Sequence, residues 1–374
     1  MASSKNLLLV GNWVSDAGYA WRMIEQFWIA LARAYSDRRV ILSFPKVSSV
    51  NPELTAAGIE IVEFAFDFTK PWDLVRFIRQ YRIGHLYLTD RPYMTWLYPL
   101  FRLFGVRSII VHAHSAPRTH MPHGLKRVAK SIAVRVIGAD AYIACSRYVL
   151  DRFRDCGRIP ANRRYLARNG IVPNTLQRGD QAIRQELNLA PDTLVVVSSA
   201  RADRDKRIDN IIDAAAIVRA ARPNIPICFL HCGGGPDFEF FAQQIREKSL
   251  EGYFRLLGKR SDMARVLIGC DIAAHASQGE VGLCLSILEF MSAGLPSVVA
   301  DEPSVWCECI RDDETGLLFR SGSPEDLSEK LLRLIDDASL RQRLGANARR
   351  TANAHYQLRD TVAAVIKVVS AVAA

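Results

Sequence analysis

The stretch from Ser277 to Pro296 constrains the fold of this chain more than any other. A strand-like run, residues 271–276, leads into a short polar loop that contains Gly282, and an almost wholly apolar helical segment, residues 283–291, follows. A strand, a glycine-containing loop and a helix in this order present free backbone N–H groups and the positive end of a helix dipole. The stretch therefore predicts a phosphate-binding site at the start of the helix.

The apolar segment carries a single carboxylate, Glu289. Burying an unpaired carboxylate is costly, so this side chain needs a partner. The hydroxyl groups of a ligand would supply one. A buried Arg or a backbone group would supply one equally well, and the sequence leaves both alternatives open.

Length and pattern indicate two domains. A chain of 374 residues is too long for one ordinary core. Short apolar, β-rich runs alternate with helical patterns, which predicts an α/β fold of doubly wound parallel sheets that bind ligands at the carboxyl ends of their strands. The expected strands are residues 6–10, 39–44, 60–66, 85–89, 107–112, 141–144, 194–199, 225–231, 253–257, 271–276 and 297–300.

Composition agrees with a soluble globular protein. Hydrophobic residues make up 49% and charged residues 24% of the chain. No apolar run is long enough for a transmembrane helix, and the first apolar run is too short for a signal peptide. The eight cysteines form no CxxC pair, which favours small core residues in a cytosolic protein over a metal site.

Charge is distributed unevenly along the chain. Residues 1–170 contain 25 Lys or Arg and 12 Asp or Glu, a net charge of +13, and the remaining 24 basic and 27 acidic residues give −3. This asymmetry predicts an anionic partner for the first half, such as a membrane surface, a phosphorylated acceptor or nucleic acid. The segment Gly124–Ile137 is a basic amphipathic helix suited to an anionic membrane. Its apolar face could instead pack inside the first domain.

Two cations follow the expected strand at residues 194–199. Arg201 and Lys206 lie five residues apart, and together they can converge on a diphosphate. The alternative is a solvated loop, because the surrounding sequence RADRDKR is highly charged. Asp203 and Asp205 also form a DxD pattern, but they lie between the two proposed phosphate ligands, which disfavours a metal site.

Further candidates lie at the carboxyl ends of strands in the first half. His112 and His114 end the strand 107–112 and point to the same face, so spacing does not choose between them; His114 is nearer the loop and is preferred. The loop containing Asp16 and Gly18 follows the first strand. It lacks the GxGxxG fingerprint, which makes NAD a poor fit.

The pattern of Glu, a glycine-containing loop and Leu-Glu-x-Met-x-x-Gly-x-Pro resembles the retaining glycosyltransferases of family 4, which have the GT-B fold. In that family two glutamates separated by seven residues hold the sugar and the ribose of a nucleotide-sugar donor. Glu289 matches the second position. Glu280 matches the first with a loop one residue longer, since eight residues separate the two. The family also has an Arg and a Lys at the spacing of Arg201 and Lys206, followed by a Gly where this chain has Arg207.

The resemblance implies a role for each candidate. Glu280 and His114 would be catalytic residues at the transferred sugar, and Glu289 would bind the donor ribose. The donor diphosphate would be bound by Arg201, Lys206, Gly282 and Leu283, with no metal required. Asp16 and Gly18 are first-loop candidates for the acceptor. Two Rossmann-like domains would face a cleft, with the acceptor-side domain at residues 1–173, the donor domain at 174–355, and a last helix, 356–374, returning to the first domain.

The implied activity is that of a retaining, hexosyltransferase-type glycosyltransferase of polysaccharide biosynthesis. It would move a sugar from a UDP-, GDP- or ADP-linked donor to a glycan or lipid-linked acceptor. The expected location is cytoplasmic, with peripheral contact at the inner face of an anionic membrane. Two alternatives remain: a nucleotide-sugar epimerase of the same fold, and a non-catalytic protein that binds anions or nucleic acid. No recognisable nucleic-acid motif supports the second, and nucleic acid is not an expected partner.

Overall fold

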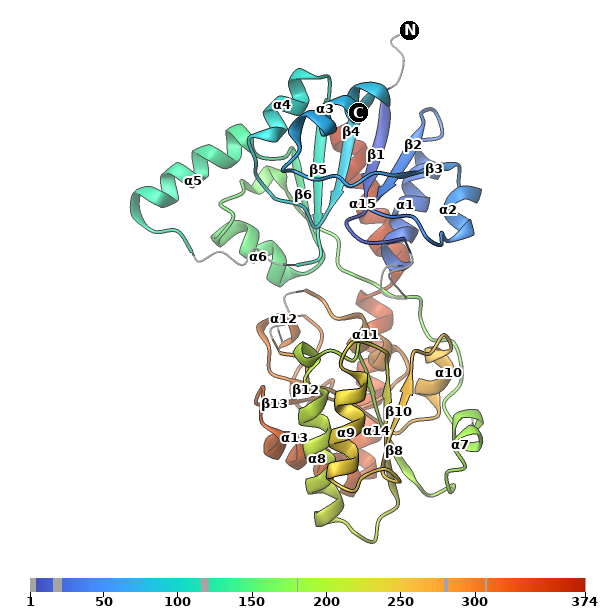
Figure 1. The fold of residues 1–374 in the computed structure, drawn as a ribbon. Helices are drawn as coiled ribbons and strands as arrows, with labels where there is room; N and C mark the ends of the chain where they lie inside the picture. The colour runs from blue at the N-terminus through green and yellow to red at the C-terminus, as the bar shows by residue number, and fades with distance from the viewer. Residues whose placement is uncertain are drawn as a thin grey trace. The chain divides into compact units, whose positions relative to one another are not determined.

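A computed structural model describes residues 5–15, 22–115, 121–179, 181–278, 282–306 and 308–373, leaving out the side chain of Trp306. The chain divides into two compact units (Figure 1). The first unit comprises Met1–Asn169, Val281–Leu283 and Leu358–Ala374. The second comprises Gly170–Glu280 and Cys284–Gln357. No helix in the described ranges is long and apolar enough to cross a membrane.

The first unit is built on a parallel sheet. Its described strands are β1 (Asn6–Val10), β2 (Val40–Phe44), β3 (Ile59–Glu63), β4 (Ile83–Thr89), β5 (Ser108–Ala113), β6 (Ala141–Ala144) and β7 (Arg164–Leu166). They lie in the order β3-β2-β1-β4-β5-β6-β7, so the winding direction reverses between β1 and β4. Every residue of β4 and β5 is buried, as expected for parallel strands covered on both faces.

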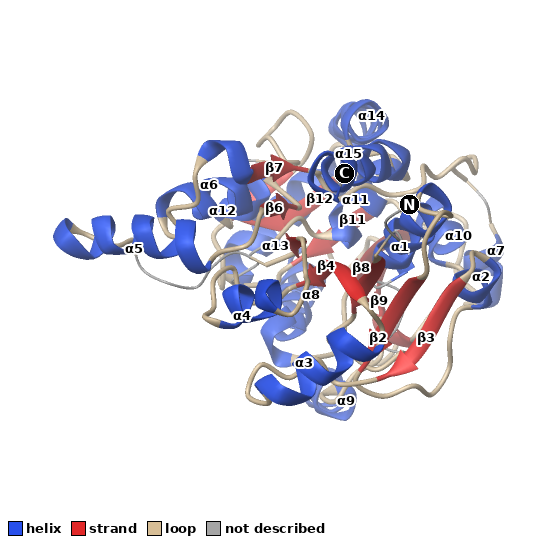
Figure 2. Ribbon diagram, turned by 90° about the horizontal axis from the view of Figure 1, so that it is seen from above, coloured by secondary structure: helices blue, strands red, loops and turns tan. Residues whose placement is uncertain are grey.

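Helices cover the first sheet, with one exception. Ser146 caps one of them by accepting a hydrogen bond from the Val149 N–H (3.1 Å). The last helix joins this unit, where the Tyr35 hydroxyl donates to Ser370 Oγ (3.2 Å). The exception is α5, which extends away from the sheet (Figure 2). The described helices are α1 (Arg22–Ala34), α2 (Pro52–Ala56), α3 (Pro71–Gln80), α4 (Leu97–Leu103), α5 (Gly124–Ile137), α6 (Arg147–Asp155), the 3₁₀ turn η2 (Ala161–Arg163) and α15 (Leu358–Ala373).

The second unit repeats the plan with a smaller parallel sheet. Its described strands are β8 (Leu194–Ser199), β9 (Ile227–Cys232), β10 (Phe254–Gly258), β11 (Ile272–His275), β12 (Ser297–Ala300) and β13 (Leu317–Phe319). Their order is β10-β9-β8-β11-β12-β13, and the winding direction reverses between β8 and β11. In β8, Val196 belongs to one hydrophobic cluster, and its neighbours Val195 and Val197 belong to another. Both faces of the sheet are therefore covered.

One long helix of the second unit begins at clear signals. Ser323 caps its helix by accepting from the Asp326 N–H, and Pro324 is the first helical residue, as the sequence predicts. The described helices are α7 (Ala182–Glu186), the 3₁₀ turn η3 (Arg204–Lys206), α8 (Ile208–Ala221), α9 (Phe238–Glu247), α10 (Met263–Ile268), α11 (Leu285–Ser292), α12 (Pro303–Trp306), α13 (Pro324–Asp336) and α14 (Ala338–His355).

The predicted fold class of two Rossmann-like parallel-sheet units is confirmed. Besides the two 3₁₀ turns, the sequence did not predict five short elements: α2, β7, α10, α12 and β13. Each has three to six residues, which is too short to display a helical or strand period of its own. Their places are fixed by packing against the longer elements.

Candidate functional site

The candidate site of the second unit lies where its sheet changes winding direction. β8 and β11 are parallel neighbours, and the chain leaves their carboxyl ends in different directions. Doubly wound sheets bind ligands at such a point. The loop that follows β8 carries Arg201 and Lys206, and the chain after β11 leads to Gln278 and then to α11.

The cations of the β8 loop are arranged by a carboxylate between them. Asp203 accepts the Asp205 N–H (3.2 Å) and receives Arg201 Nη2 at 2.5 Å. The hydrogen bond from the Asp205 N–H, together with the charge of Arg201, lowers the pKa of Asp203. The Arg201 side chain is 67% exposed, and Lys206 is partly buried at the end of η3. Asp203 therefore caps the turn. Among the described residues, no cluster of three metal-ligating side chains occurs.

Arg207 joins the two loops of the site. Its guanidinium donates to Gln278 Oε1 (2.5 Å), on the chain after β11, and also to Asp209 and Asn210 at the start of α8. The Arg207 backbone is left-handed, with φ 50° and ψ 43°. That conformation favours glycine, which explains why the resembled family has Gly at this position. Here the side-chain contacts hold an arginine in the strained backbone.

This backbone gives a direct prediction for stability. Arg207→Gly and Arg207→Ala remove the same guanidinium contacts, but only alanine keeps the steric cost of the left-handed conformation. We expect the Gly variant to be more stable than the Ala variant by roughly 0.5–1 kcal/mol. Denaturant unfolding of both proteins measures the difference, and equal stability of the two variants would show that the backbone relaxes out of this conformation.

A third loop packs directly against the β8 loop. It follows β9 and contains Gly233, where a Cβ atom would lie 1.7 Å from the Ala200 carbonyl oxygen. The Ala202 N–H donates to the Gly234 carbonyl (3.0 Å), and the Asp237 N–H donates to the Ala202 carbonyl (3.0 Å). This close approach requires glycine and gives the chain that carries Arg201 a rigid support.

Glu289 lies in α11 and has no polar partner among the described residues. The helix packs most of its residues into the core, and the Glu289 side chain is partly buried. No hydrogen bond or ion pair joins its carboxylate to another residue within the described part of the chain, so the alternative of a buried Arg partner finds no support there. Burial raises the pKa of Glu289 from 4.5 to about 7. Cys284, at the N-cap of α11, makes no capping hydrogen bond through its side chain, which leaves the helix start open to an anion.

The raised pKa predicts how stability depends on pH. Between pH 4.5 and about 7 the folded protein holds a proton on Glu289 that the unfolded chain releases, so the wild type loses stability as pH rises through this window. The Glu289→Gln variant has no carboxyl group at this position, so its stability does not fall in this way as pH rises. We expect the variant to be more stable than the wild type by up to about 3 kcal/mol above pH 7, with little difference below pH 4.5.

Thermal unfolding of the two proteins across this pH range tests the prediction. Glu251→Gln, which makes the same chemical change at an exposed position, is the matched control and should leave the pH dependence unchanged. A Glu289→Gln variant that is less stable than the wild type at high pH would reveal a partner for the carboxylate.

The first unit places the two candidate histidines side by side. The ring centroids of His112 and His114 are 4.3 Å apart. His112 is fully buried and bonded to the Tyr87 hydroxyl, and burial lowers its pKa well below 6.5. His114 follows β5 and is partly exposed. Its position at the loop makes it the better candidate for contact with a ligand.

Asp90 is a further candidate, which the sequence did not single out. It follows β4 in a left-handed conformation (φ 48°), and its Oδ1 accepts the His114 N–H at 2.7 Å, while Oδ2 lies 3.6 Å from His114 Nδ1. Burial opposes ionisation of Asp90, but the contacts with His114 outweigh it and lower the pKa of the carboxyl. The available signal was a carboxylate directly after a largely apolar strand, at the edge that carries His114.

The remaining candidates lie in the first unit, in the second unit or outside the described residues. Gly282 and Leu283 belong to the first unit, where the Asn169 side chain donates to the Leu283 carbonyl (3.3 Å) and a Cβ on Gly282 would meet the His114 carbonyl oxygen. Arg201, Lys206 and Glu289 belong to the second unit. The candidates Asp16, Gly18 and Glu280 lie outside the described residues.

Solved structures identify the fold. The protein superposes on Anabaena HepE in complex with UDP with a TM-score of 0.76 at 20% identity, covering 98% of this chain and 100% of that one. A glycosyltransferase from Rickettsia africae gives 0.78 at 14% identity, covering 99% and 98% of the two chains. The predicted GT-B fold of glycosyltransferases is therefore confirmed.

Sequence relatives match mainly the second unit. Residues 179–351 match the family Glycosyl transferases group 1. A D-inositol 3-phosphate glycosyltransferase of Stackebrandtia nassauensis is 27% identical over 259 residues, 64% of this chain and 58% of that protein. The N,N'-diacetylbacillosaminyl-diphospho-undecaprenol alpha-1,3-N-acetylgalactosaminyltransferase of Campylobacter jejuni is 39% identical over 98 residues, 26% and 25% of the two chains. This chain spans less than half the length of several curated relatives that it matches.

Proposed function

We propose that the protein is a retaining glycosyltransferase of family 4 that moves a sugar from a nucleotide sugar to a glycan or a lipid-linked acceptor. The observation that carries the proposal is the Glu289 carboxylate. It is desolvated, has no partner among the described residues, and lies on the helix that follows the switch point of the sheet. A donor's ribose hydroxyls would provide the hydrogen bonds that this carboxylate lacks.

The donor diphosphate would bind beside Glu289. Negative charge develops on the diphosphate as the bond to the sugar breaks, and Arg201, Lys206 and the uncapped start of α11 would stabilise it without reorganising. Gly282 and Leu283 would offer backbone N–H groups to the same oxygens. These groups supply the counter-charge that a metal ion supplies in other transferases, so the proposed reaction requires none.

The sugar and the acceptor would involve the remaining candidates. Glu280 would hold the sugar hydroxyls, and His114, positioned by Asp90, would contact the transferred sugar. Asp16 and Gly18 would approach the acceptor, which we assign to the first unit. Residues 1–173 would thus form the acceptor domain and residues 174–355 the donor domain.

The comparisons suggest which substrates to test first. HepE is described in complex with UDP and with UDP-glucose, so uridine nucleotides are the first donors. The Campylobacter relative is named for a diphospho-undecaprenol acceptor, and an Acholeplasma laidlawii relative is named an alpha-monoglucosyldiacylglycerol synthase. Lipid-linked acceptors are therefore the first to pair with these donors.

Proton NMR of the product tests the proposal. An enzyme that retains configuration gives a glycoside with the same anomeric configuration as the donor, and the Glu289→Gln protein should form it far more slowly. A product of opposite configuration would contradict retention. Conversion of the nucleotide sugar to its epimer without an acceptor would contradict transfer and identify an epimerase.

A further inference from the structure

The helix α5 exposes its apolar residues instead of burying them. Leu125, Val128, Ile132 and Val136 are 87%, 57%, 58% and 64% exposed, and Val134 is the one buried residue of the helix. The sequence left open whether this face packs inside the first domain. The structure shows that it does not.

The four exposed residues form one stripe. They are spaced by three, four and four residues, which at about 100° per residue confines them to an arc of about 80°. Val134 falls on the opposite side of the helix by the same count. The side that faces the unit and the side that carries the stripe are therefore different, and α5 extends away from the sheet (Figures 1 and 2).

The segment that contains this stripe carries charge of one sign. No acidic residue occurs between Asp90 and Asp140, a segment that contains eight Lys or Arg. On α5 itself Lys126, Arg127 and Arg135 are exposed. By the same count Arg135 and Lys126 flank the stripe on its two sides. Arg127 and Lys130 fall on the side of Val134, where Lys130 lies 5.5 Å from the centre of the Tyr93 ring.

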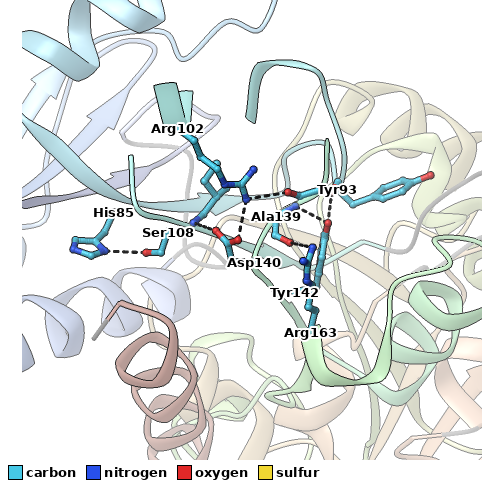
Figure 3. A network of polar contacts seen from close by, with 10 residues as sticks. His85, Tyr93, Arg102, Ser108, Ala139, Asp140, Tyr142 and Arg163 are labelled. Carbon is cyan, nitrogen blue, oxygen red and sulfur yellow. Dashed lines mark hydrogen bonds and ion pairs between the residues drawn. The ribbon is translucent and has the colours of Figure 1, made fainter. Parts of the chain in front are cut away.

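The base of α5 is firmly held. The Tyr142 hydroxyl accepts the Ala139 N–H (2.7 Å) and donates to the Tyr93 carbonyl (2.6 Å), directly after the helix ends (Figure 3). Arg102 donates to Asp140 (2.9 Å) and to the Gly138 carbonyl (3.1 Å). This network fixes the C-terminal end of α5, so the unit presents its stripe on a rigid support.

We propose that α5 docks the first unit on an anionic lipid bilayer, with the apolar stripe in the interface and the flanking residues Lys126 and Arg135 against lipid headgroups. A helix of 14 residues is about 21 Å long, too short to span a hydrocarbon core of about 30 Å, so it lies in the plane of the interface. This inference does not depend on the proposed transfer reaction.

Charge distinguishes the bilayer from two other occupants. A second copy of this chain on the same stripe would bring basic residues against basic residues, with no acidic side chain between Asp90 and Asp140 to pair with them. Nucleic acid would satisfy the basic residues but would leave the exposed aliphatic stripe in water. An anionic bilayer satisfies both features.

Co-sedimentation with vesicles tests the proposal. The full chain should sediment with vesicles that contain phosphatidylglycerol and remain in solution with pure phosphatidylcholine, and its binding should fall as salt rises. Val128→Glu combined with Ile132→Glu should reduce the bound fraction about tenfold without affecting the fold, because both side chains are exposed. The matched control is Val172→Glu combined with Leu176→Glu, which changes the charge equally at exposed positions of the second unit and should bind like the wild type.

Three outcomes would overturn the proposal. The wild type could remain in solution with anionic vesicles at low salt. The α5 variant could bind as well as the control variant. Sedimentation velocity could show a dimer of the wild type that the α5 variant abolishes, which would assign the stripe to a second copy of the chain.

Discussion

Lys206→Ala is expected to lower kcat for the nucleotide sugar about 100- to 1,000-fold, the usual effect of removing one preorganised group that stabilises charge in a transition state. The leaving diphosphate gains charge as the sugar departs, and Lys206 lies at the end of η3 on the loop that follows β8. Because this charge is larger in the transition state than in the bound donor, the loss should fall mainly on kcat rather than on KM.

The matched control is Arg204→Ala. Arg204 is a cation in the same turn, but its guanidinium lies over the Phe240 ring (4.1 Å) and near Asp237 (3.5 Å), toward α9. The variant should keep nearly full turnover. Equal losses in the two variants would mean that the loop, and not the Lys206 charge, determines the rate.

Glu289→Gln is expected to weaken use of the donor about 10- to 100-fold, which corresponds to loss of a charge-assisted hydrogen bond. The substitution nearly preserves shape and removes the charge that the ribose hydroxyls would contact. We expect a smaller loss for Glu280→Gln, because Glu289 is in register with the family pattern and Glu280 is displaced by one residue.

A change in the ligand makes this test specific for ribose. Binding of a nucleoside diphosphate and of its 2′,3′-dideoxy analogue is measured for the wild type and for Glu289→Gln. The variant should lose affinity for the natural nucleotide and show little change for the analogue, which lacks the hydroxyls. A similar loss for both ligands, or a larger loss in Glu280→Gln, would remove Glu289 from the ribose site.

The same carboxylate links donor binding to stability. Above pH 7 the desolvated charge of Glu289 destabilises the folded protein, whereas Gln at this position does not carry that charge. A variant that is both more stable and less active is the expected sign of a residue kept for binding. The two measurements on Glu289→Gln therefore support each other.

Periodicity in the sequence was enough to predict the sheets. The long strands and helices repeat apolar residues at the spacing of their type, and the alternation of the two requires parallel sheets. The same pattern could not reveal α10 or β13, whose places come from neighbouring elements. It also could not predict whether α5 buries its apolar face. The sequence pattern of an amphipathic helix is the same when that face packs on a protein core and when it is exposed.

Only some residues of the candidate site could likewise be predicted from the sequence. Glu289 could be singled out from sequence, since one carboxylate in an apolar helix demands a partner. The connection of Arg207 to Gln278 could not, because it joins two loops that are distant in the chain. Asp90 was missed for the same reason: its significance comes from contact with His114, and only the pairing of β4 with β5 brings the two together.

Titration calorimetry with UDP, GDP and ADP, and then with their sugars, tests the central claim that the second unit binds a nucleotide-sugar donor. We predict saturable one-to-one binding of one nucleoside diphosphate to the wild type, and weaker binding to Glu289→Gln at the same pH. Absence of heat with every nucleoside diphosphate and every nucleotide sugar would contradict the account.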